Sequence, residues 1–143
     1  QYNVHDFEKA FELKFNIRPV MDKTIFSEFD DAFQKYFNGS LTRFDLPLDI
    51  LSGTLFQKKV WSMLKNIPFG QVRSYKWVAK ELGMPKASRA VGNANGKNPV
   101  PIIIPCHRVI CSNGKMGGFS SGIEIKKKLL KHEEGSVTKL LNC

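Results

Sequence analysis

The stretch RAVGNANGKNPVPIIIPCHRVIC, residues 89–111, contains the features that decide the predicted fold. Its apolar run at 100–104 predicts a short buried strand, which Pro105 ends. Residues that follow a buried strand lie at the edge of a core, so we expect Cys106, His107 and Arg108 to lie there. Adjacent residues of an extended strand point to opposite faces. Contact between the thiol and the imidazole therefore requires a turn or a bridging water.

Small side chains just before this strand predict a helix with a narrow surface. Ala90 and Ala94 recur at helical spacing, and Gly92 lies between them at a cost of about 1 kcal/mol relative to alanine. Such a surface suits close packing against protein or close approach to a ligand backbone. Arg89 is the long cationic side chain in the middle of this helix, which Pro85 is expected to begin.

A second predicted helix, SYKWVAKEL at residues 74–82, comes before it. Ser74 is a suitable N-cap, and Gly83 is a suitable stop. Two short helices joined by a tight turn with glycine form a helix-turn-helix pattern. By itself this pattern is weak, because any two packed helices look similar.

The N-terminal part of the chain predicts mixed structure. Residues 11–17 alternate apolar and polar and predict a half-buried strand. Ser27 is expected to cap a following helix that stops at Gly39. After a linker at 38–53, Thr54 and Gln57 form a capping box for a helix whose aromatic and aliphatic side chains are expected in the core: Phe56, Val60, Trp61 and Leu64. The predicted fold class is an α/β N-terminal lobe over residues 1–50 and an α-rich domain with a helix-turn-helix over residues 51–143.

The last predicted helix covers residues 123–133. Its inward face is expected to hold Ile125, Leu129 and Leu130, and its lysines are expected to face water or phosphate: Lys126, Lys127, Lys128 and Lys131. Glu133 lies at the predicted C-terminal end, where the helix dipole disfavours a carboxylate. This position is a mild indication of a functional role, and random surface charge is the alternative.

The charge of the chain is distributed unevenly. Residues 1–70 are neutral overall, whereas residues 71–143 hold thirteen Lys or Arg against four Asp or Glu, which is the whole net charge of +9. A one-sided basic surface is typical of a polyanion-binding protein, and a solvated lysine-rich face explains it equally well. An apolar content of 42% predicts a globular protein. We find neither a secretory-signal pattern nor an apolar run near the roughly 18 residues of a membrane span.

The cysteines predict a reducing compartment and no metal site. Cys106, Cys111 and Cys143 form a sparse, odd-numbered set without framework spacing. Structural zinc needs four ligands at recognisable spacing, and the group of Cys106, His107 and Cys111 lacks a fourth. A thiol becomes a strong nucleophile only as the thiolate, which an imidazole oriented by a carboxylate can generate. Cys106, His107 and Glu133 supply one group of each kind. From residue types alone, a buried structural cysteine is the more common outcome.

The combination of several ordered runs resembles the O6-alkylguanine-DNA alkyltransferase family. PCHRV at 105–109 is the family's signature, and IPCHRVICSNGKMGGFSSG with the preceding RAVGNANGKNPVPII extends it. Supporting runs are GTLFQKKVW at 53–61, IPFGQVRSY at 67–75 and KKKLLKHE at 126–133. The resemblance covers about residues 33–134. The first thirty residues match weakly, and we expect part of the family's N-terminal sheet to be absent.

The resemblance implies a suicidal repair reaction. Cys106 would accept the alkyl group from O6 of guanine, His107 would act through a water as its base, Glu133 would polarise His107, and Asn98 would brace the network by hydrogen bonds. The damaged base would be flipped out of the duplex. The family uses no cofactor, and we find no nucleotide-binding glycine-rich loop or metal motif. Because the product is a stable thioether, each chain would act once.

The resemblance also implies residues that hold the DNA and the base. Arg89 would fill the gap left by the flipped base, and Ala90, Gly92 and Ser112 would contact the DNA at the minor groove. The flipped guanine would meet four further residues: Tyr75, Val109, Phe119 and Ser120. Phe119 departs from the family pattern, since many relatives have tyrosine there. A phenylalanine can still stack on the base, but it cannot donate a hydroxyl hydrogen bond.

The expected partner is double-stranded DNA containing O6-alkylguanine, which a monomer would bind. No membrane partner is expected, and cooperativity on DNA stays open. The expected location is the nucleoid-associated cytoplasm of a prokaryote or the nucleus of a eukaryote. Three other interpretations remain: a relative that binds the lesion without repairing it, a helix-turn-helix regulator, and a cysteine hydrolase. The first lacks the acceptor cysteine, the second does not require PCHR, and the third usually has a glycine-rich oxyanion signature.

Overall fold

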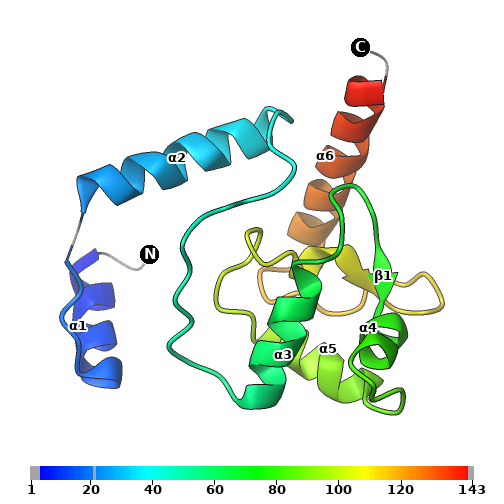
Figure 1. Cartoon of the computed structure of the whole chain (residues 1–143), viewed down its shortest axis with the longest axis horizontal. Coiled ribbons are helices and arrows are strands. Elements are labelled where there is room, and N and C mark those ends of the chain that lie inside the picture. The colour runs from blue at the N-terminus through cyan, green and yellow to red at the C-terminus, as the bar shows by residue number, and fades with distance from the viewer. Residues whose placement is uncertain (1–3, 21, 142–143) are drawn as a thin grey trace. The chain divides into compact units, whose positions relative to one another are not determined.

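The computed structural model describes residues 4–20 and 22–141, and within them the chain is mainly helical (Figure 1). Compact packing divides the chain into two units, residues 1–34 and residues 35–143. The boundary falls within the second helix. The elements, in chain order, are α1 (Val4–Phe15), α2 (Lys23–Phe37), α3 (Leu55–Leu64), β1 (Arg73–Ser74), α4 (Tyr75–Glu81), α5 (Ser88–Gly96), the short 3-10 helix η1 (Cys106–Arg108), β2 (Val109–Ile110) and α6 (Ile123–Leu141).

The first unit contradicts the predicted strand at residues 11–17. Helix α1 covers most of that range, and the rings of Phe11 and Phe15 lie 4.7 Å apart, centroid to centroid. This i,i+4 pair is the contact that a helix makes and a strand does not. The prediction gave more weight to the short alternation than to this aromatic spacing. Among the described residues of this unit no strand is assigned.

Helix α2 begins earlier than predicted. Asp22 caps it, because its Oδ1 accepts a hydrogen bond from the Thr24 amide at 2.8 Å. Ser27 lies inside the helix, where its hydroxyl donates to the Thr24 carbonyl at 2.7 Å, so its predicted capping role is wrong. The predicted stop at Gly39 is confirmed: the helix ends at Phe37, and Gly39 adopts φ = +84°.

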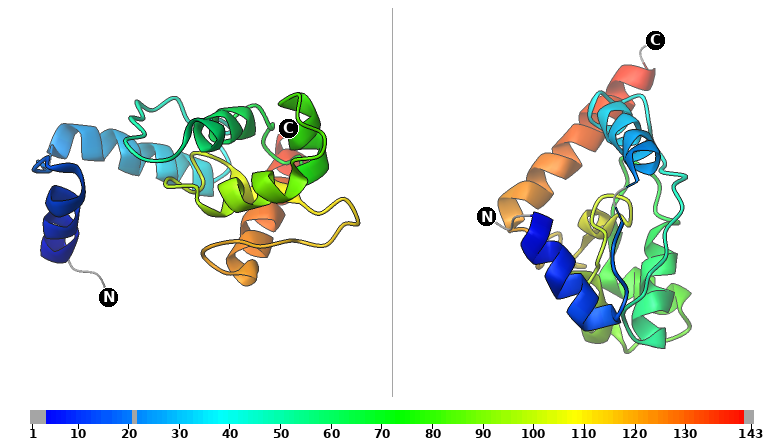
Figure 2. Two further views of the ribbon diagram at one scale, coloured as in Figure 1. Left: turned by 90° about the horizontal axis from the view of Figure 1, so that it is seen from below. Right: turned by 90° about the vertical axis from the view of Figure 1, so that its left-hand side faces the viewer.

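The second unit is built around three adjacent helices. Helices α3, α4 and α5 contact one another, and η1 with β2 lies between this group and the start of α6 (Figures 1 and 2). The capping box of Thr54 and Gln57 is confirmed at the start of α3, and Ser74 caps α4 as predicted. Helix α5 begins at Ser88, so Pro85 lies in the connection and not in the first turn.

The core of the second unit joins α3, α4 and α5 to η1. Trp61 is buried at its centre and donates its indole N–H to the Ala94 carbonyl at 2.8 Å. Around it lie the buried side chains of Val60, Leu64, Ile67, Val78, Ala79, Val91, Ala94, Ile104, Cys106 and Val109. The active cysteine of the predicted site is therefore part of the hydrophobic core and not of a surface loop.

The predicted strand at 100–104 is not formed. Ile104 donates its amide to the Val100 carbonyl at 3.0 Å, which closes a turn, and only an isolated bridge joins Pro101 to Ile104. Pro99 and Pro101 have no amide donors, so this segment cannot form a regular ladder. The small parallel sheet instead pairs β1 with β2, in the register Arg73–Val109 and Ser74–Ile110.

Helix α6 runs to Leu141, eight residues beyond the predicted end. Glu133 therefore lies in the middle of a helix, so the helix-dipole reason for selecting it is wrong. The predicted faces of this helix are also wrong at two positions. Lys126 is fully buried, whereas Ile125 is 47% exposed. Leu129 is buried as predicted.

Candidate active site

The turn after Pro105 places Cys106 and His107 in the core together. Residues 106–108 form the 3-10 helix η1, closed by the Arg108 amide, which donates to the Pro105 carbonyl at 3.0 Å. Cys106 is 1% exposed and His107 is fully buried. Because a 3-10 turn replaces the extended strand, the two side chains are not forced onto opposite faces. One of the two alternatives in the sequence prediction, a turn, is therefore what the structure contains.

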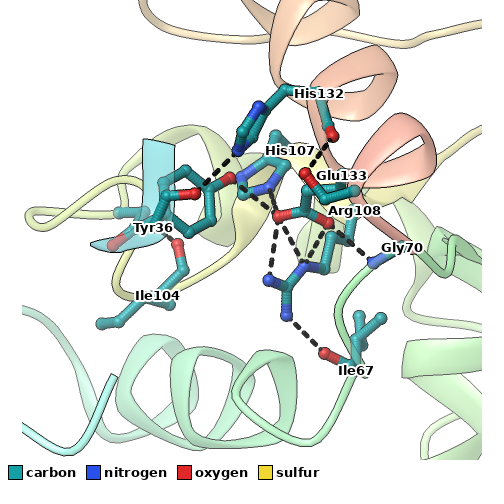
Figure 3. Close-up of polar contacts among 10 residues, drawn as sticks. Tyr36, Ile67, Gly70, Ile104, His107, Arg108, His132 and Glu133 are labelled. Carbon is teal, nitrogen blue, oxygen red and sulfur yellow. Dashed lines mark hydrogen bonds and ion pairs between the residues drawn. The ribbon is translucent and has the colours of Figure 1, made fainter. Parts of the chain in front are cut away.

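The carboxylate of Glu133 is the centre of a buried network (Figure 3). Its Oε1 lies 2.8 Å from Nε2 of His107 and accepts hydrogen bonds from the Tyr36 hydroxyl at 2.8 Å and from Nη2 of Arg108 at 2.9 Å. Its Oε2 accepts from Nε of Arg108 at 2.9 Å and from the Gly70 amide at 3.0 Å. Five donor groups from three segments of the chain thus surround one carboxylate and satisfy its lone pairs.

This network keeps Glu133 ionised. Burial by itself would raise the pKa of Glu133, but the hydrogen bonds from His107 and Arg108 and the positive charge of Arg108 outweigh it and lower the pKa to about 2. Burial lowers the pKa of His107, and the Glu133 carboxylate opposes that effect only in part. The imidazole is therefore neutral at neutral pH. An ionised carboxylate only accepts hydrogen bonds, so His107 must carry its proton on Nε2.

The second nitrogen of His107 has no protein partner. Nδ1 is buried and makes no hydrogen bond with any described residue. With the proton on Nε2, Nδ1 has a free lone pair. A neutral imidazole with one nitrogen fixed by a carboxylate and the other unoccupied is arranged to accept a proton.

The surroundings of Cys106 favour its neutral thiol form. Burial raises the pKa of the Cys106 thiol, while hydrogen bonding from Asn98 and the positive charge of Lys126 lower it in part. The thiol therefore needs a base to become a nucleophile. Asn98 also braces the approach to Cys106, since its Nδ2 donates to the Ile104 carbonyl at 2.8 Å and its Oδ1 accepts from the Val100 amide at 3.0 Å.

Lys126 is a buried cation beside this site. Its ammonium group donates to the carbonyls of Val109 and Met116, and it lies 5.9 Å from the centre of the Tyr75 ring. Burial lowers the pKa of Lys126. The sequence prediction placed Lys126 with Lys127, Lys128 and Lys131 on a face towards water or phosphate, and for Lys126 this is wrong. Its position on the helix face that meets β2 is decided by tertiary packing alone.

A pocket with a volume of about 580 Å³ opens beside Tyr75, and neither Cys106 nor the residues bonded to Glu133 are among its lining residues. Of the predicted contact residues it contains Tyr75, Arg89, Gly92, Ser112, Phe119 and Ser120, and Cys111 also lines it. Arg89, Ala90, Ser112 and Ser120 are exposed. Val109 is instead fully buried, and its carbonyl accepts from Lys126. The structure thus brings together most of the predicted DNA-binding and base-binding residues at one opening, with Val109 behind it.

Tyr75 lies against the glycines of the loop that follows β2. Gly117 adopts φ = +68°, and a Cβ atom there would lie 2.8 Å from the tyrosine ring and hydroxyl. The hydroxyl is 3.5 Å from the Gly118 carbonyl. Burial raises the pKa of Tyr75, so its hydroxyl keeps its proton at neutral pH. Gly117 is therefore required both for its backbone conformation and for the close approach of Tyr75.

Several residues of the network were missed by the sequence prediction. Tyr36 and Gly70 reach Glu133 from distant segments, and no local pattern indicates this. Asn95 donates its side-chain amide to the Cys106 carbonyl at 3.2 Å, which its position on the inner face of α5 could have indicated. Arg108 was placed at the edge of the core without a role, although its adjacency to His107 was a usable signal. Of the other cysteines, Cys111 is a free thiol, and Cys143 lies outside the described residues.

Fold and site together define a mainly helical protein in which a buried cysteine directly precedes a histidine bonded to a buried glutamate, with a pocket that residues of α4 and α5 help to line. Models of two domains match this sequence: "6-O-methylguanine DNA methyltransferase, DNA binding domain" over residues 55–135, and the same family's "ribonuclease-like domain" over residues 6–50. The chain belongs to the 6-O-methylguanine DNA methyltransferase family.

Individual relatives agree with this assignment. The methylated-DNA–protein-cysteine methyltransferase of Methanosarcina acetivorans is 52% identical over 114 residues, which cover 80% of this chain and 72% of that protein. The enzyme of the same name from Mycobacterium tuberculosis is 50% identical over 113 residues, covering 79% and 68%.

Solved structures of relatives share the fold. The crystal structure of Mycobacterium tuberculosis OGT in complex with DNA aligns with a TM-score of 0.75 at 50% identity, over 78% of this chain and 68% of that one. Schizosaccharomyces pombe Atl1 in complex with damaged DNA containing O6-carboxymethylguanine aligns with a TM-score of 0.52 at 33% identity, over 58% and 79%. In the described part of this chain, no helix is long and apolar enough to cross a membrane.

Proposed function

We propose that this chain is a methylated-DNA–protein-cysteine methyltransferase that repairs O6-alkylguanine in double-stranded DNA by moving the alkyl group onto Cys106. The observation that carries the proposal is a buried thiol next to a neutral imidazole whose Nε2 is bonded to an ionised carboxylate at 2.8 Å. Family membership and the names of the relatives support the same reaction. We assign the chemistry and the DNA contacts to residues 51–143, with residues 1–50 as the N-terminal lobe.

The reaction begins with loss of the Cys106 proton to Nδ1 of His107, through a bridging water. The thiolate sulfur attacks the alkyl carbon, a sulfur–carbon bond forms, and the carbon–O6 bond breaks with its electron pair leaving on guanine. The guanine anion then takes up one proton, which equals the proton that the thiol lost to His107, so the step conserves protons. Glu133 stabilises the imidazolium formed on the way, as a buried carboxylate does in other acid–base networks.

The exposed residues of the pocket would hold the DNA. We assign α4 and α5 as a helix-turn-helix whose second helix approaches the minor groove with Ala90 and Gly92, while Arg89 fills the gap left by the flipped base. Ser112 would contact the backbone. The target atom lies inside the base stack, so extrusion of the nucleotide is a chemical necessity. The excess charge of +9 in residues 71–143 supports phosphate-driven, salt-sensitive binding.

The flipped guanine would enter the pocket next to Tyr75. Phe119 would stack on the base, and the Ser120 amide with the carbonyls of Cys106 and Val109 would read its edge. Phe119 has no hydroxyl, so Tyr75, which keeps its proton at neutral pH, is the candidate donor to the leaving guanine. No group in the network can cleave the resulting thioether, so each chain acts once. Its place of action is the compartment that holds the DNA.

Intact-protein mass spectrometry tests this function. Equimolar protein is mixed with a duplex that contains one O6-methylguanine, beside a Cys106→Ser control. The expected result is a gain of one methyl group per chain, localised to Cys106 by peptide mapping and absent from the control. An unmodified protein, or a methyl group at another residue, would contradict the proposal.

A second function, binding of the lesion without repair, is favoured by one observation. The chain resembles Schizosaccharomyces pombe Atl1, whose structure contains DNA with O6-carboxymethylguanine. The same experiment separates the two functions. Tight binding of the damaged duplex without any gain in mass would establish the non-catalytic alternative.

A further inference from the structure

Tyr36 is held at both of its ends by two consecutive residues of α6. Its hydroxyl donates to Oε1 of Glu133 at 2.8 Å, and its backbone carbonyl lies 2.8 Å from Nε2 of His132 (Figure 3). A carbonyl only accepts, so His132 must donate this bond. Tyr36 lies 97 positions before Glu133 in the chain. The C-terminal end of α2 is thus bonded directly to the carboxylate that orients His107.

The ring of Tyr36 is fixed by packing. It is fully buried, with ring centroids 5.3 Å from Phe44, 5.8 Å from Phe69 and 5.2 Å from His132. Leu129 completes this cluster. The hydroxyl therefore cannot rotate towards water or exchange Glu133 for another acceptor. Because a buried donor without a partner is costly, this bond persists as long as the fold does.

The hydroxyl is a permanent donor. Burial, followed by the negative charge of Glu133, raises the pKa of Tyr36 far above its ordinary value. The hydroxyl keeps its proton in the pH range of the folded protein, so it can always donate to Oε1. A donor that keeps its proton has two effects on Glu133. It withdraws negative charge from Oε1, and it constrains the orientation of the carboxylate.

Oε1 is also the oxygen that receives His107. Arg108 and Gly70 satisfy Oε2, and Oε1 accepts hydrogen bonds from His107, from Nη2 of Arg108 and from the Tyr36 hydroxyl, so the carboxylate is bound on both of its edges. Without the hydroxyl, Oε1 would be more basic and less constrained in angle. The His107 ring, whose one side-chain hydrogen bond among the described residues is to Oε1, would lose part of its orientation.

We propose that Tyr36 is a positioning residue for alkyl transfer: its hydroxyl fixes the Glu133 oxygen that holds His107, and thereby keeps Nδ1 of His107 free to accept the Cys106 proton. This inference rests on the proposed function. The last turn of α2 would thus influence the transfer rate through Glu133, although Tyr36 makes no hydrogen bond to Cys106 among the described residues.

The charges around His107 give the sign of the expected effect. Arg108 and Lys126 are the neighbouring cations and lower the pKa of His107, after burial, whereas Glu133 raises it. Cys106 precedes it on η1, and His132 lies beyond Tyr36. Removing the Tyr36 hydroxyl takes one donor from Glu133 and strengthens its attraction for a proton on His107. The pKa of His107 should rise. As the pH falls, His107 should therefore become protonated, and stop acting as a base, at a higher pH than in the wild type.

The test compares single-turnover transfer rates over pH for the wild type, Tyr36→Phe and Phe44→Leu. We expect Tyr36→Phe to transfer about two- to twelvefold more slowly, the range that one net hydrogen bond of about 0.5–1.5 kcal/mol represents. Its acidic limb should also move to higher pH. Phe44→Leu loosens the same aromatic cluster without touching Glu133, so it should lower the melting temperature but leave the pH profile in place. An unshifted profile in Tyr36→Phe would overturn the inference.

A nitrogen-15 NMR titration of His107 provides a readout that does not depend on DNA. Tyr36→Phe should raise its titration midpoint and increase the population protonated on Nδ1. If the wild type transfers no alkyl group, the proposed function fails, and this titration alone decides the role of Tyr36. If Tyr36→Phe does not fold, Tyr36→Met replaces it, because that change also removes the hydroxyl and keeps a long apolar side chain in the cluster. An unchanged His107 titration in the folded variant contradicts the inference.

Discussion

The Glu133 network and the pocket lined by Tyr75 and Arg89 differ in how firmly their side chains are held. Every oxygen of Glu133 is bonded inside the core, and His107, Arg108 and Tyr36 are buried around it. In the pocket, Arg89, Ser112 and Ser120 are exposed, and two glycines form the loop at its edge. A low-dielectric, preorganised setting suits proton transfer. A phosphate-binding surface instead needs charges that reach solvent and a backbone that a nucleotide can approach.

Removing the central carboxylate should produce the largest effect. In Glu133→Ala, the buried guanidinium of Arg108 loses its counter-ion, and a buried pair broken in this way costs about 3–5 kcal/mol of unfolding free energy. Urea denaturation measures this loss. Glu124→Ala is the matched control on the same helix, because Glu124 and Lys127 form a solvent-exposed ion pair, and such pairs contribute little to stability. Equal effects of the two changes would mean that the network does not stabilise the fold.

Acid should destabilise the protein through the same groups. Glu133 has a pKa of about 2 when folded and 4.5 as its ordinary value, so its contribution is complete above pH 4.5 and is lost as the pH falls towards 2. A shift of this size corresponds to about 3 kcal/mol. The lowered pKa of His107 acts in the same direction from pH 6.5 downwards, since the unfolded chain takes up a proton that the folded chain does not.

Unfolding free energies measured from pH 7 to pH 3 check this prediction. Glu133→Gln should show a flatter curve below pH 4.5, because its side chain does not titrate. A wild-type curve that stays level down to pH 3 would contradict the ionised state of Glu133.

At the edge of the pocket, Gly117→Ala should lower the unfolding free energy less than Glu133→Ala does, and its main effect should be on alkyl transfer. A left-handed conformation costs a residue with a side chain about 1–2 kcal/mol. The new methyl group would also displace Tyr75, whose ring and hydroxyl lie within 2.8 Å of that position. We expect a modest fall in unfolding free energy and a clear loss of alkyl transfer, measured by the mass assay over time. Gly114→Ala, also at positive φ but without contacts within 4 Å, separates backbone strain from the collision with Tyr75.

The smallest effect on stability is expected at Arg89. Arg89→Ala removes an exposed charge and should change the unfolding free energy by less than about 0.5 kcal/mol. Binding to duplex DNA should weaken, and if Arg89 neutralises one phosphate, the logarithmic salt slope should fall by about 1. Affinity measured at several salt concentrations tests this. A large loss of stability would mean that this side chain belongs to the core network and not to the DNA surface.

Local signals in the sequence predicted the ends of several helices. The side chains of Thr54 and Gln57 cap α3, the Ser74 hydroxyl caps α4, and glycine at positive φ follows α2 and α4. These features depend on neighbours within four residues, so a single stretch of sequence contains all of their partners. The adjacency of Cys106 and His107 and the one-sided basic charge belong to the same category, and the family resemblance added the roles that we propose for them.

Only the tertiary structure decided which polar groups are buried and what they bind. Lys126 resembles its exposed lysine neighbours in sequence, yet it lies in the core because its face of α6 meets β2. Tyr36 reaches Glu133 across 97 positions, and the segment 100–104 turns on itself instead of forming a strand. The energy of a buried charge or hydroxyl depends on partners brought from distant segments, and no periodicity along the chain records which segments will meet.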